Sequence, residues 1–510
     1  MSRRSTLRAR RRQTAGTGLR QSPFCRYENP YPPFEILSAD RVEAIHDASL
    51  EILESIGVNF LLDEARRLLK AAGADVDPDS TRVRFERGLV LEAMSKVPAA
   101  FDISARNPQR SLHFGDRSIN FAAVSSPPNA SDMDRGRRTG NFEDFCNFLK
   151  LTQSVNVAQI VSGHAVEPVD IETPIRHLVA TRAMIEHTDK IFRLYSLGRQ
   201  RVLDVLEMVK ISRGFDDAAL SREPSVFTMV NSNSPLQYDI PMLWGMIELS
   251  LRNQPVVVTP FTLAGAMAPV TLAGALAQQN AEALAGMAFC EMVNPGAPVM
   301  YGGFTSNVDM KSGAPAFGTP EYAKATLIGG QLARRYDVPY RSSNVNASNA
   351  PDVQSAYESQ MALWSSVLGH AHMVHHGLGW LEGGLCASFE KFIIDAEMVQ
   401  MMVELLKPVE VNADTLALDA IREVGPGGHF FGAAHTLERY ETAFYQPMLS
   451  DWRNFETWSE AGAQDATLRA NRIFKSVLEH YEPPPLDEGV REQLNAFVDK
   501  RTAEGGASVN

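Results

Sequence analysis

Eight short apolar runs, separated by helix-length segments, constrain the fold of this chain more than any other feature of its sequence. The runs recur roughly every 30 to 42 residues with an amphipathic segment between them, as an alternating β/α fold requires. Eight β/α units over about 260 residues are typical of a (β/α)8 barrel, the TIM barrel. A doubly wound open sheet produces a similar alternation and stays open as an alternative. The predicted strands cover residues 119–124, 158–163, 191–197, 226–230, 256–261, 299–303, 338–342 and 373–377.

The segments on either side of the predicted barrel domain, 119–406, have a different character. The helix start and stop signals within residues 35–118 predict a cap. Its first helix begins at Ser38 and ends at Gly57, and its second helix covers 63–72. The end of this cap predicts a small hairpin, with strands at 101–106 and 111–115. The pattern of residues 407–510 predicts a helical extension, which packs outside the barrel or at an oligomer contact.

Residues 1–34 predict a disordered basic tail. Its arginines are not followed by an apolar run, so neither a signal peptide nor a twin-arginine export signal is indicated. These arginines are Arg3, Arg4, Arg8, Arg10, Arg11, Arg12 and Arg20.

Composition excludes several classes of protein. The chain has 510 residues, of which 44% are hydrophobic and 22% charged, so it is long enough for a large core and is neither disordered nor fibrous. Its formal net charge of -12 argues against a general nucleic-acid binder, which needs a cationic face. The four cysteines are far apart and form no metal or disulfide pattern, which fits a reducing cytoplasm. No uninterrupted apolar segment is long enough to span a bilayer.

The residues just past the predicted strands are polar and largely uncharged, with aromatic side chains between them. In a (β/α)8 barrel the active site forms where the C-terminal ends of the strands meet. Aromatic faces attract a quaternary ammonium group, so this pattern predicts a pocket for a small organic cation with a polar tail. Alternatively, the aromatic side chains are core packing, and Glu382 pairs with Arg341 or caps a helix. The predicted substrate-binding residues are Tyr195, Phe261, Phe304, Arg341, Asn344, His375, His376 and Trp380, and Glu382 is a candidate catalytic residue.

Four histidines, at positions 370, 372, 375 and 376, offer a second interpretation, a metal-dependent barrel hydrolase. However, no carboxylates surround them, and strand alternation should place His375 and His376 on opposite faces. A hydrogen bond from one histidine to substrate is therefore favoured over a metal site. No G-x-S-x-G, Walker A or H-E-x-x-H motif is present to support other hydrolase or nucleotide-binding classes.

Several motifs resemble the trimethylamine methyltransferase (MttB-like) family of corrinoid-dependent methyltransferases. They extend over most of the chain from Glu35 onward, which makes the resemblance specific. The matching segments are PFTLAGAMAPVTLAGALAQQNAE at 260–282, DVQSAYE at 352–358, GWLEGGLCASFE at 379–390, GGHFFGAAHTL at 427–437 and FYQP at 444–447.

The resemblance implies a TIM barrel that passes a methyl group from a methylamine to the cobalt(I) form of a corrinoid. This cofactor is carried by a separate small protein that docks over the barrel mouth. Members that act on trimethylamine have pyrrolysine in the loop before the Gln-x-x-Tyr-Glu motif, and this position falls near Asn349, the candidate catalytic residue of that loop. An asparagine favours the pyrrolysine-free branch, which is similar to glycine betaine and related quaternary-amine methyltransferases.

In that branch, Arg341, His375 or His376 would meet a substrate carboxylate. A homo-oligomer is expected, since barrels of this size often associate. A non-catalytic protein that binds quaternary amines stays open as a further alternative.

Overall fold

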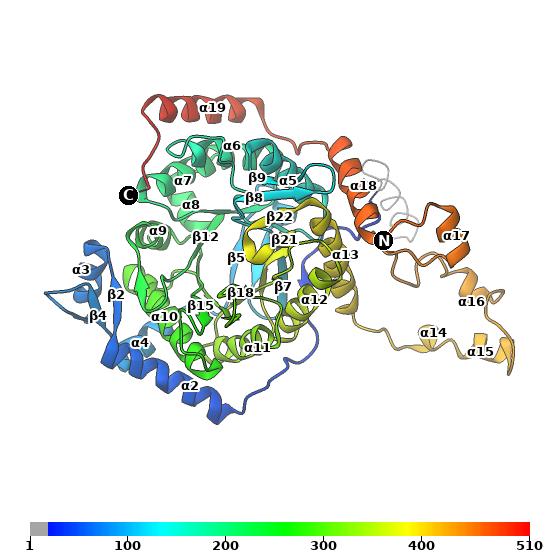
Figure 1. The fold of residues 1–510 in the computed structure, drawn as a ribbon, viewed down its shortest axis with the longest axis horizontal. Coiled ribbons are helices and arrows are strands. Elements are labelled where there is room, and N and C mark those ends of the chain that lie inside the picture. Colours follow the sequence, from blue (N-terminus) through cyan, green and yellow to red (C-terminus); the bar gives the residue numbers. More distant parts are fainter. Residues whose placement is uncertain (1–18, 510) are drawn as a thin grey trace.

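Eight parallel strands form a closed barrel at the centre of the computed structural model, which describes residues 19–509 (Figure 1). Neighbouring strands pair in chain order, and the last strand pairs with the first, with Met373 opposite Asn120. This closure confirms the predicted TIM barrel and excludes the open sheet. The strands are β7 (Ser118–Ala123), β10 (Ile160–Val161), β11 (Ile191–Leu194), β12 (Val226–Val230), β14 (Val256–Val258), β16 (Val299–Gly302), β19 (Tyr340–Ser343) and β20 (Met373–Leu378).

Helices surround the barrel, one main helix after each strand (Figure 1). Their apolar residues pack against the outer face of the barrel, as the amphipathic pattern predicted. They are α5 (Phe142–Ser154), α6 (Arg176–His187), α7 (Arg199–Arg213), α9 (Ile240–Ser250), α10 (Leu272–Val293), α11 (Pro320–Arg335), α12 (Val353–Leu368) and α13 (Phe389–Leu405), with the short α8 (Asp217–Arg222) after α7.

The N-terminal end of the barrel is closed by the predicted hairpin, formed by β5 (Phe101–Ile103) and β6 (Leu112–Phe114). These strands share one apolar cluster with side chains of the barrel interior, including Ile160, Ile191 and Met300. Because this end is filled, a site inside the barrel is open only toward the C-terminal ends of the strands.

The rest of the cap lies against the outside of the barrel. Helix α2 (Ala39–Glu51) begins after Ser38, although that side chain makes no capping hydrogen bond, and it continues as a π-helical segment (Ile52–Ile56). Gly57 ends it with φ of 81°, where an added Cβ would lie 2.6 Å from the carbonyl oxygen of Val83. The remaining elements are β2 (Val58–Phe60), α3 (Asp63–Ala71), β3 (Asp75–Val76), β4 (Arg82–Arg84) and α4 (Arg87–Met94).

The segment predicted as a basic tail falls partly on residues 1–18, which lie outside the described residues. Within its remaining part, β1 (Tyr27–Glu28) pairs antiparallel with β7, and Leu19 and Tyr27 are buried.

The C-terminal extension has two parts with different packing (Figure 1). Helices α18 (Ala466–Glu479) and α19 (Glu488–Ala503) lie on the helical layer, α18 against α13 and α5, and α19 against α6 and α7. The preceding part, with α14 (Ala413–Leu416), α15 (Leu418–Val424), α16 (Ala434–Leu437) and α17 (Phe455–Glu460), projects sideways from the barrel. No helix of residues 19–509 is long and apolar enough to cross a membrane.

Candidate functional site

A cavity of about 230 Å³ lies at the C-terminal ends of the barrel strands, where the fold predicts an active site. Pockets for drug-sized ligands measure roughly 300 to 1,000 Å³, so this one suits a smaller molecule. Six of the eight predicted substrate-binding residues meet here. The cavity is lined by Ser125, Ser126, Arg193, Met229, Asn231, Thr259, Phe261, Phe304, Arg341, His375, His376, Trp380, Gly383 and Gly384.

Two buried guanidinium groups dominate the charge of the cavity. Arg193 donates to the Ser125 hydroxyl at 3.1 Å and the Met229 carbonyl at 3.3 Å, and Arg341 donates to the Gly303 carbonyl at 3.4 Å. The Nε–H of each has no hydrogen-bond partner among the described residues. No acidic side chain lines the described cavity, and no carboxylate between residues 19 and 509 pairs with either arginine. The protein therefore leaves two buried positive charges uncompensated.

Both guanidinium groups remain charged at neutral pH. Burial lowers the pKa of Arg341 to about 10, which is still far above neutrality, and it also lowers the pKa of Arg193. A buried charge without a partner is unfavourable, so an anionic group that entered this cavity would be attracted to both guanidinium groups.

His375 and His376 both line the cavity, with their ring centroids 4.0 Å apart. The prediction that strand alternation would place them on opposite faces is wrong. The register of β20 against β7 is irregular between Val374 and Leu378, and His376 has φ of 54°. Such a bulge interrupts the two-residue period of side-chain direction, so both imidazoles turn to one pocket.

The two imidazoles are neutral hydrogen-bonding groups. Burial is the main reason that the pKa of each lies well below its ordinary value, and the positive charges of Arg341 and Arg193 act in the same direction. Both ring nitrogens of His375 and Nδ1 of His376 are buried without a partner among the described residues. Buried polar atoms normally have partners, so these nitrogens are available to hydrogen-bond a polar group in the cavity.

Aromatic side chains form another wall of the cavity. The ring centroid of Phe304 lies 5.1 Å from that of Phe261 and 6.2 Å from that of Trp380. Trp380 also contacts His376, with 4.0 Å between ring centroids, and Phe317 packs behind Phe304 at 5.4 Å. The cavity thus combines a cationic, hydrogen-bonding part with an aromatic part that can hold methyl groups and a positive charge.

A buried ion pair fixes the bulge that carries these groups. Lys391 pairs with Asp395, and neither side chain is exposed to solvent. The other carboxylate oxygen of Asp395 accepts a hydrogen bond from the Gly379 backbone at 2.8 Å. Asn344 does not line the cavity, and its amide donates to the Gly377 carbonyl at 3.0 Å. Asn344 therefore supports the backbone beside the pocket.

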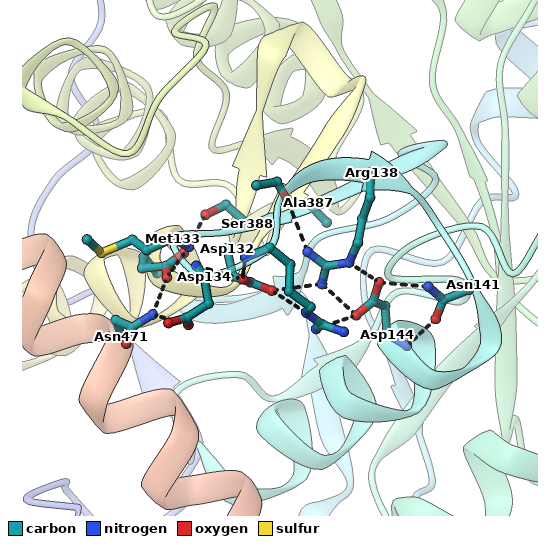
Figure 2. A network of polar contacts seen from close by, with 12 residues as sticks. Asp132, Met133, Asp134, Arg138, Asn141, Asp144, Ala387, Ser388 and Asn471 are labelled. Atoms are coloured by element: carbon teal, nitrogen blue, oxygen red, sulfur yellow. Dashed lines mark hydrogen bonds and ion pairs between the residues drawn. The ribbon is translucent and has the colours of Figure 1, made fainter.

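The strand that contains Trp380, β21 (Trp380–Leu381), belongs to a small sheet with β22 (Cys386–Ser388), β8 (Asn129–Asp132) and β9 (Gly136–Thr139). Figure 2 shows the polar network that anchors it. Arg138 pairs with the buried carboxylates of Asp132 at 2.8 Å and Asp144 at 2.7 Å.

The same network reaches the C-terminal extension. Asn471 of α18 donates to the carboxylate of Asp134, in the turn between β8 and β9, at 3.0 Å (Figure 2). The small sheet that holds Trp380 is thus anchored both by the ion pairs of Arg138 and by the hydrogen bond from Asn471 of α18.

Glu382 lies in the turn after β21 but does not line the cavity. It pairs with Arg137 of β9 at 2.9 Å, not with Arg341 as the alternative interpretation expected. This contact holds the turn in which Gly383 and Gly384 form part of the cavity. An added Cβ at Gly384 would lie 2.5 Å from the Trp380 ring, so glycine is required at this close approach. A catalytic role of Glu382 stays a prediction.

Asn349 is exposed and does not line the central cavity. Its loop is shaped by Glu358, whose carboxylate accepts hydrogen bonds from the backbone of Ala347 at 2.8 Å and Ser348 at 3.0 Å. Gln354 donates to the same carboxylate at 2.8 Å. The conformation of this loop therefore explains two polar residues of the DVQSAYE segment, whereas a catalytic role of Asn349 stays a prediction.

Tyr195 lies behind the site, in a neighbouring cavity of about 450 Å³. Its hydroxyl contacts Ser125 at 3.0 Å and Ser126 at 2.9 Å, and its ring lies 4.5 Å from the Arg193 guanidinium carbon. Tyr195 therefore positions Arg193 and the serines.

Arg193 is the main residue that sequence reasoning missed. It is the one charged residue in the predicted strand 191–197, and it stands two positions before Tyr195. Since alternate residues of a strand share a face, this charge in an apolar run was a signal for an inward-pointing arginine.

The histidines do not gather at one point. The His372 ring accepts a hydrogen bond from the Tyr340 backbone at 2.9 Å, and His370 lies in the turn before β20, so both are on the opposite end of the strand from His376. Among residues 19–509, no group of three or more metal-binding side chains is close enough to hold an ion. The hydrolase interpretation therefore has no ligand cluster to support it.

A (β/α)8 barrel with a small aromatic and cationic pocket at its strand ends defines an enzyme that acts on a small molecule. Comparison with known proteins makes this more specific. The chain belongs to the trimethylamine methyltransferase (MTTB) family, whose family model matches residues 3–506. It is therefore a methyltransferase, and the resemblance found in the sequence is confirmed.

Similar proteins are matched over nearly their whole length. A glycine betaine methyltransferase of Desulfitobacterium hafniense (strain Y51) is 35% identical, over 93% of this chain and 98% of the relative. Trimethylamine methyltransferase MttB of D. hafniense (strain DSM 10664 / DCB-2) is 28% identical, over 92% and 95%. Among solved structures, the monomethylamine methyltransferase (MtmB) of Methanosarcina barkeri is 10% identical with a TM-score of 0.49, over 96% of this chain and 92% of that chain.

Proposed function

We propose that this methyltransferase takes its methyl group from a quaternary amine that also carries a carboxylate, such as glycine betaine. The main support is the pair of buried, uncompensated guanidinium groups, Arg193 and Arg341, in the same cavity as the aromatic wall. A carboxylate would neutralise this charge, and the ring faces of Phe304 and Trp380 would receive the trimethylammonium end.

The same charges argue against a simple amine as the substrate. Trimethylamine is a cation when protonated, and choline is one at every pH, so each would enter a cavity that already holds two positive charges. Like charges in a low-dielectric site repel each other strongly. A zwitterion would avoid this repulsion, because its carboxylate would lie between the guanidinium groups and its own ammonium group.

The residues of the cavity would bind and orient the substrate without moving a proton. A quaternary amine that loses a methyl group leaves as a neutral tertiary amine, so no acid is needed, and the cavity offers neutral imidazoles and no carboxylic acid. When present, a reduced corrinoid supplies a strong cobalt nucleophile that accepts the methyl group. The chain's own task is to hold the N-methyl carbon toward the mouth and exclude water.

A substrate panel tests this function. Purified enzyme and a reduced corrinoid protein are mixed with glycine betaine, choline or trimethylamine, and the loss of the cobalt(I) absorption band is followed. We expect rapid loss with glycine betaine and little with the other two. Equal rates with choline would contradict a carboxylate requirement. Tight calorimetric binding of glycine betaine without methyl transfer would instead favour the non-catalytic binding protein.

The aromatic wall carries a prediction of its own. We expect Trp380→Ala to weaken glycine betaine binding by roughly 1 to 2 kcal/mol, because a desolvated cation–π contact of Trp380 is lost. Trp380→Phe keeps a ring and should lose less. Isothermal titration calorimetry measures both variants, and an affinity unchanged in Trp380→Ala would make Trp380 a packing residue only.

The partner and the compartment belong to the same proposal. The corrinoid would be carried by a separate small protein that docks over the barrel mouth. The enzyme would work in the cytoplasm, where thiols stay reduced, as all four cysteines of this chain are free.

A further inference from the structure

Residues 407–447 form a projecting segment, here called the arm. It leaves the barrel after α13 and extends sideways, away from the helical layer, with α14, α15 and α16 along it (Figure 1). It returns to the body at Met448.

The arm is held in place at its base. The carboxylate of Glu397 in α13 accepts hydrogen bonds from the Met448 backbone at 2.8 Å and the Ser450 hydroxyl at 2.8 Å. Farther out, Arg439 donates to both carboxylate oxygens of Asp414 at 2.9 Å, which ties the region of α16 to α14. The arm therefore has a defined position and a defined shape.

The surface of the arm is unusually apolar. Phe431 is 84% exposed and Phe444 is 79% exposed, and Tyr440 and Phe430 are exposed as well. At about 200 Å² for a whole aromatic side chain, these four alone expose roughly 500 Å². One side of a standard protein interface covers about 800 Å². Exposed aliphatic residues of the arm add to this area: Val409, Val411, Leu416, Leu418, Ile421 and Leu437.

The helices of the arm also need packing from outside. The three helices have four, seven and four residues, and isolated helices of this length are marginal in water. Their large apolar residues, Leu416, Leu418, Ile421 and Leu437, face solvent within this chain. A partner that covers the arm would therefore stabilise its helices and bury its aromatic side chains.

The same chain carries a complementary uncovered surface. Val353, Tyr357, Met361 and Trp364 are all exposed on α12, and their spacing of three or four residues places them on one face of the helix. An apolar groove of about 630 Å³ adjoins this face, since Met361 lines it together with residues of α11 and α2.

We propose that the arm packs on the α12 face of a second copy of this chain, which makes the enzyme a homo-oligomer. A chain with both an apolar projection and an apolar recess can bury each against another copy of itself, in equal numbers. A protein docked over the barrel mouth would not cover the arm, which lies beside the barrel (Figure 1). Each copy has a net charge of -12, which opposes association, and burial of the exposed apolar side chains would offset this repulsion.

Mass measurement tests the arm contact on the full chain. Multi-angle light scattering at micromolar concentration should give a multiple of 56.2 kDa. We expect Phe431→Asp combined with Phe444→Asp to shift the protein to the monomer, and Trp364→Asp on the α12 face to do the same. Leu251→Asp, at an exposed apolar site after α9, is the matched control and should leave the mass unchanged. A monomeric wild type, or either surface variant that keeps the oligomer, would overturn the proposal.

Hydrogen exchange of the unmodified protein tests the contact without relying on the variants. Amides of residues 413–437 should become more protected as the protein concentration rises through the association range. Protection that does not change with concentration would contradict the arm contact. Neither measurement uses a substrate or a corrinoid, so the result is independent of the proposed reaction.

Discussion

Replacement of Arg341 by methionine should weaken binding of glycine betaine on the order of 100-fold and, at the same time, make the free enzyme more stable. Removing one partner of a buried, hydrogen-bonded charge pair costs about 2 to 5 kcal/mol of binding energy. At 3 kcal/mol, affinity falls on the order of 100-fold. Calorimetric titration with glycine betaine measures this loss.

The gain in stability has a separate cause. Burial lowers the pKa of Arg341 to about 10, and at about 1.4 kcal/mol for each pH unit this corresponds to roughly 3 kcal/mol of unfavourable burial at neutral pH. Methionine fills similar space without a charge, so the melting temperature of the ligand-free protein should rise. A loss of affinity together with a gain in melting temperature would show that Arg341 serves ligand binding at the expense of stability.

Arg341→Lys is the matched control because it keeps the charge but loses the two-pronged geometry of the guanidinium group. It should bind glycine betaine more weakly than the wild type but better than Arg341→Met, and it should not gain stability. If Arg341→Met binds normally, the carboxylate is not held by Arg341. If it melts at a lower temperature, the guanidinium group stabilises the fold and is not uncompensated.

Replacement of Lys391 by methionine should destabilise the protein by about 3 to 5 kcal/mol, because it leaves the buried carboxylate of Asp395 without its partner. Urea unfolding at neutral pH measures the loss. Lys391→Met combined with Asp395→Asn removes both charges and keeps an acceptor for the Gly379 backbone. This double variant should recover most of the stability, and equal instability of the two would contradict an ion-pair effect.

The effect of Lys391→Met should also depend on pH in a definite direction. Burial raises the pKa of Asp395, and loss of the lysine charge raises it further. A carboxyl group with a raised pKa in the folded state favours folding while it is protonated, and this contribution disappears as the pH rises through that pKa. The deficit should therefore be small in acid and grow toward neutral pH. A deficit that is constant between pH 5 and pH 8 would show that the lost contact is not electrostatic.

Part of the site could be read from the sequence because it follows from local patterns. The position of each strand fixes where its C-terminal end lies, and barrel closure brings these ends together. Phe304, Arg341 and Trp380 were therefore placed in one cavity although up to 76 residues separate them in the chain. The aromatic character of the wall follows in the same way.

Other features of the site depend on contacts between distant residues. The shared cavity of His375 and His376 depends on a bulge in β20 that changes the side-chain period, and no local pattern of apolar residues predicts it. Likewise, Glu382 is bound by Arg137 of a hairpin that lies far away in the chain.

The sequence by itself determined the alternating β/α architecture and the family, because periodicity and motifs are local properties of a chain. Only the tertiary structure decided the charge balance of the pocket. Whether Arg193 and Arg341 are compensated depends on every group that approaches them in space, and in the folded protein no carboxylate of the described residues does so. That balance favours a substrate with its own carboxylate, because the free energy of a buried charge is set by its neighbours in three dimensions.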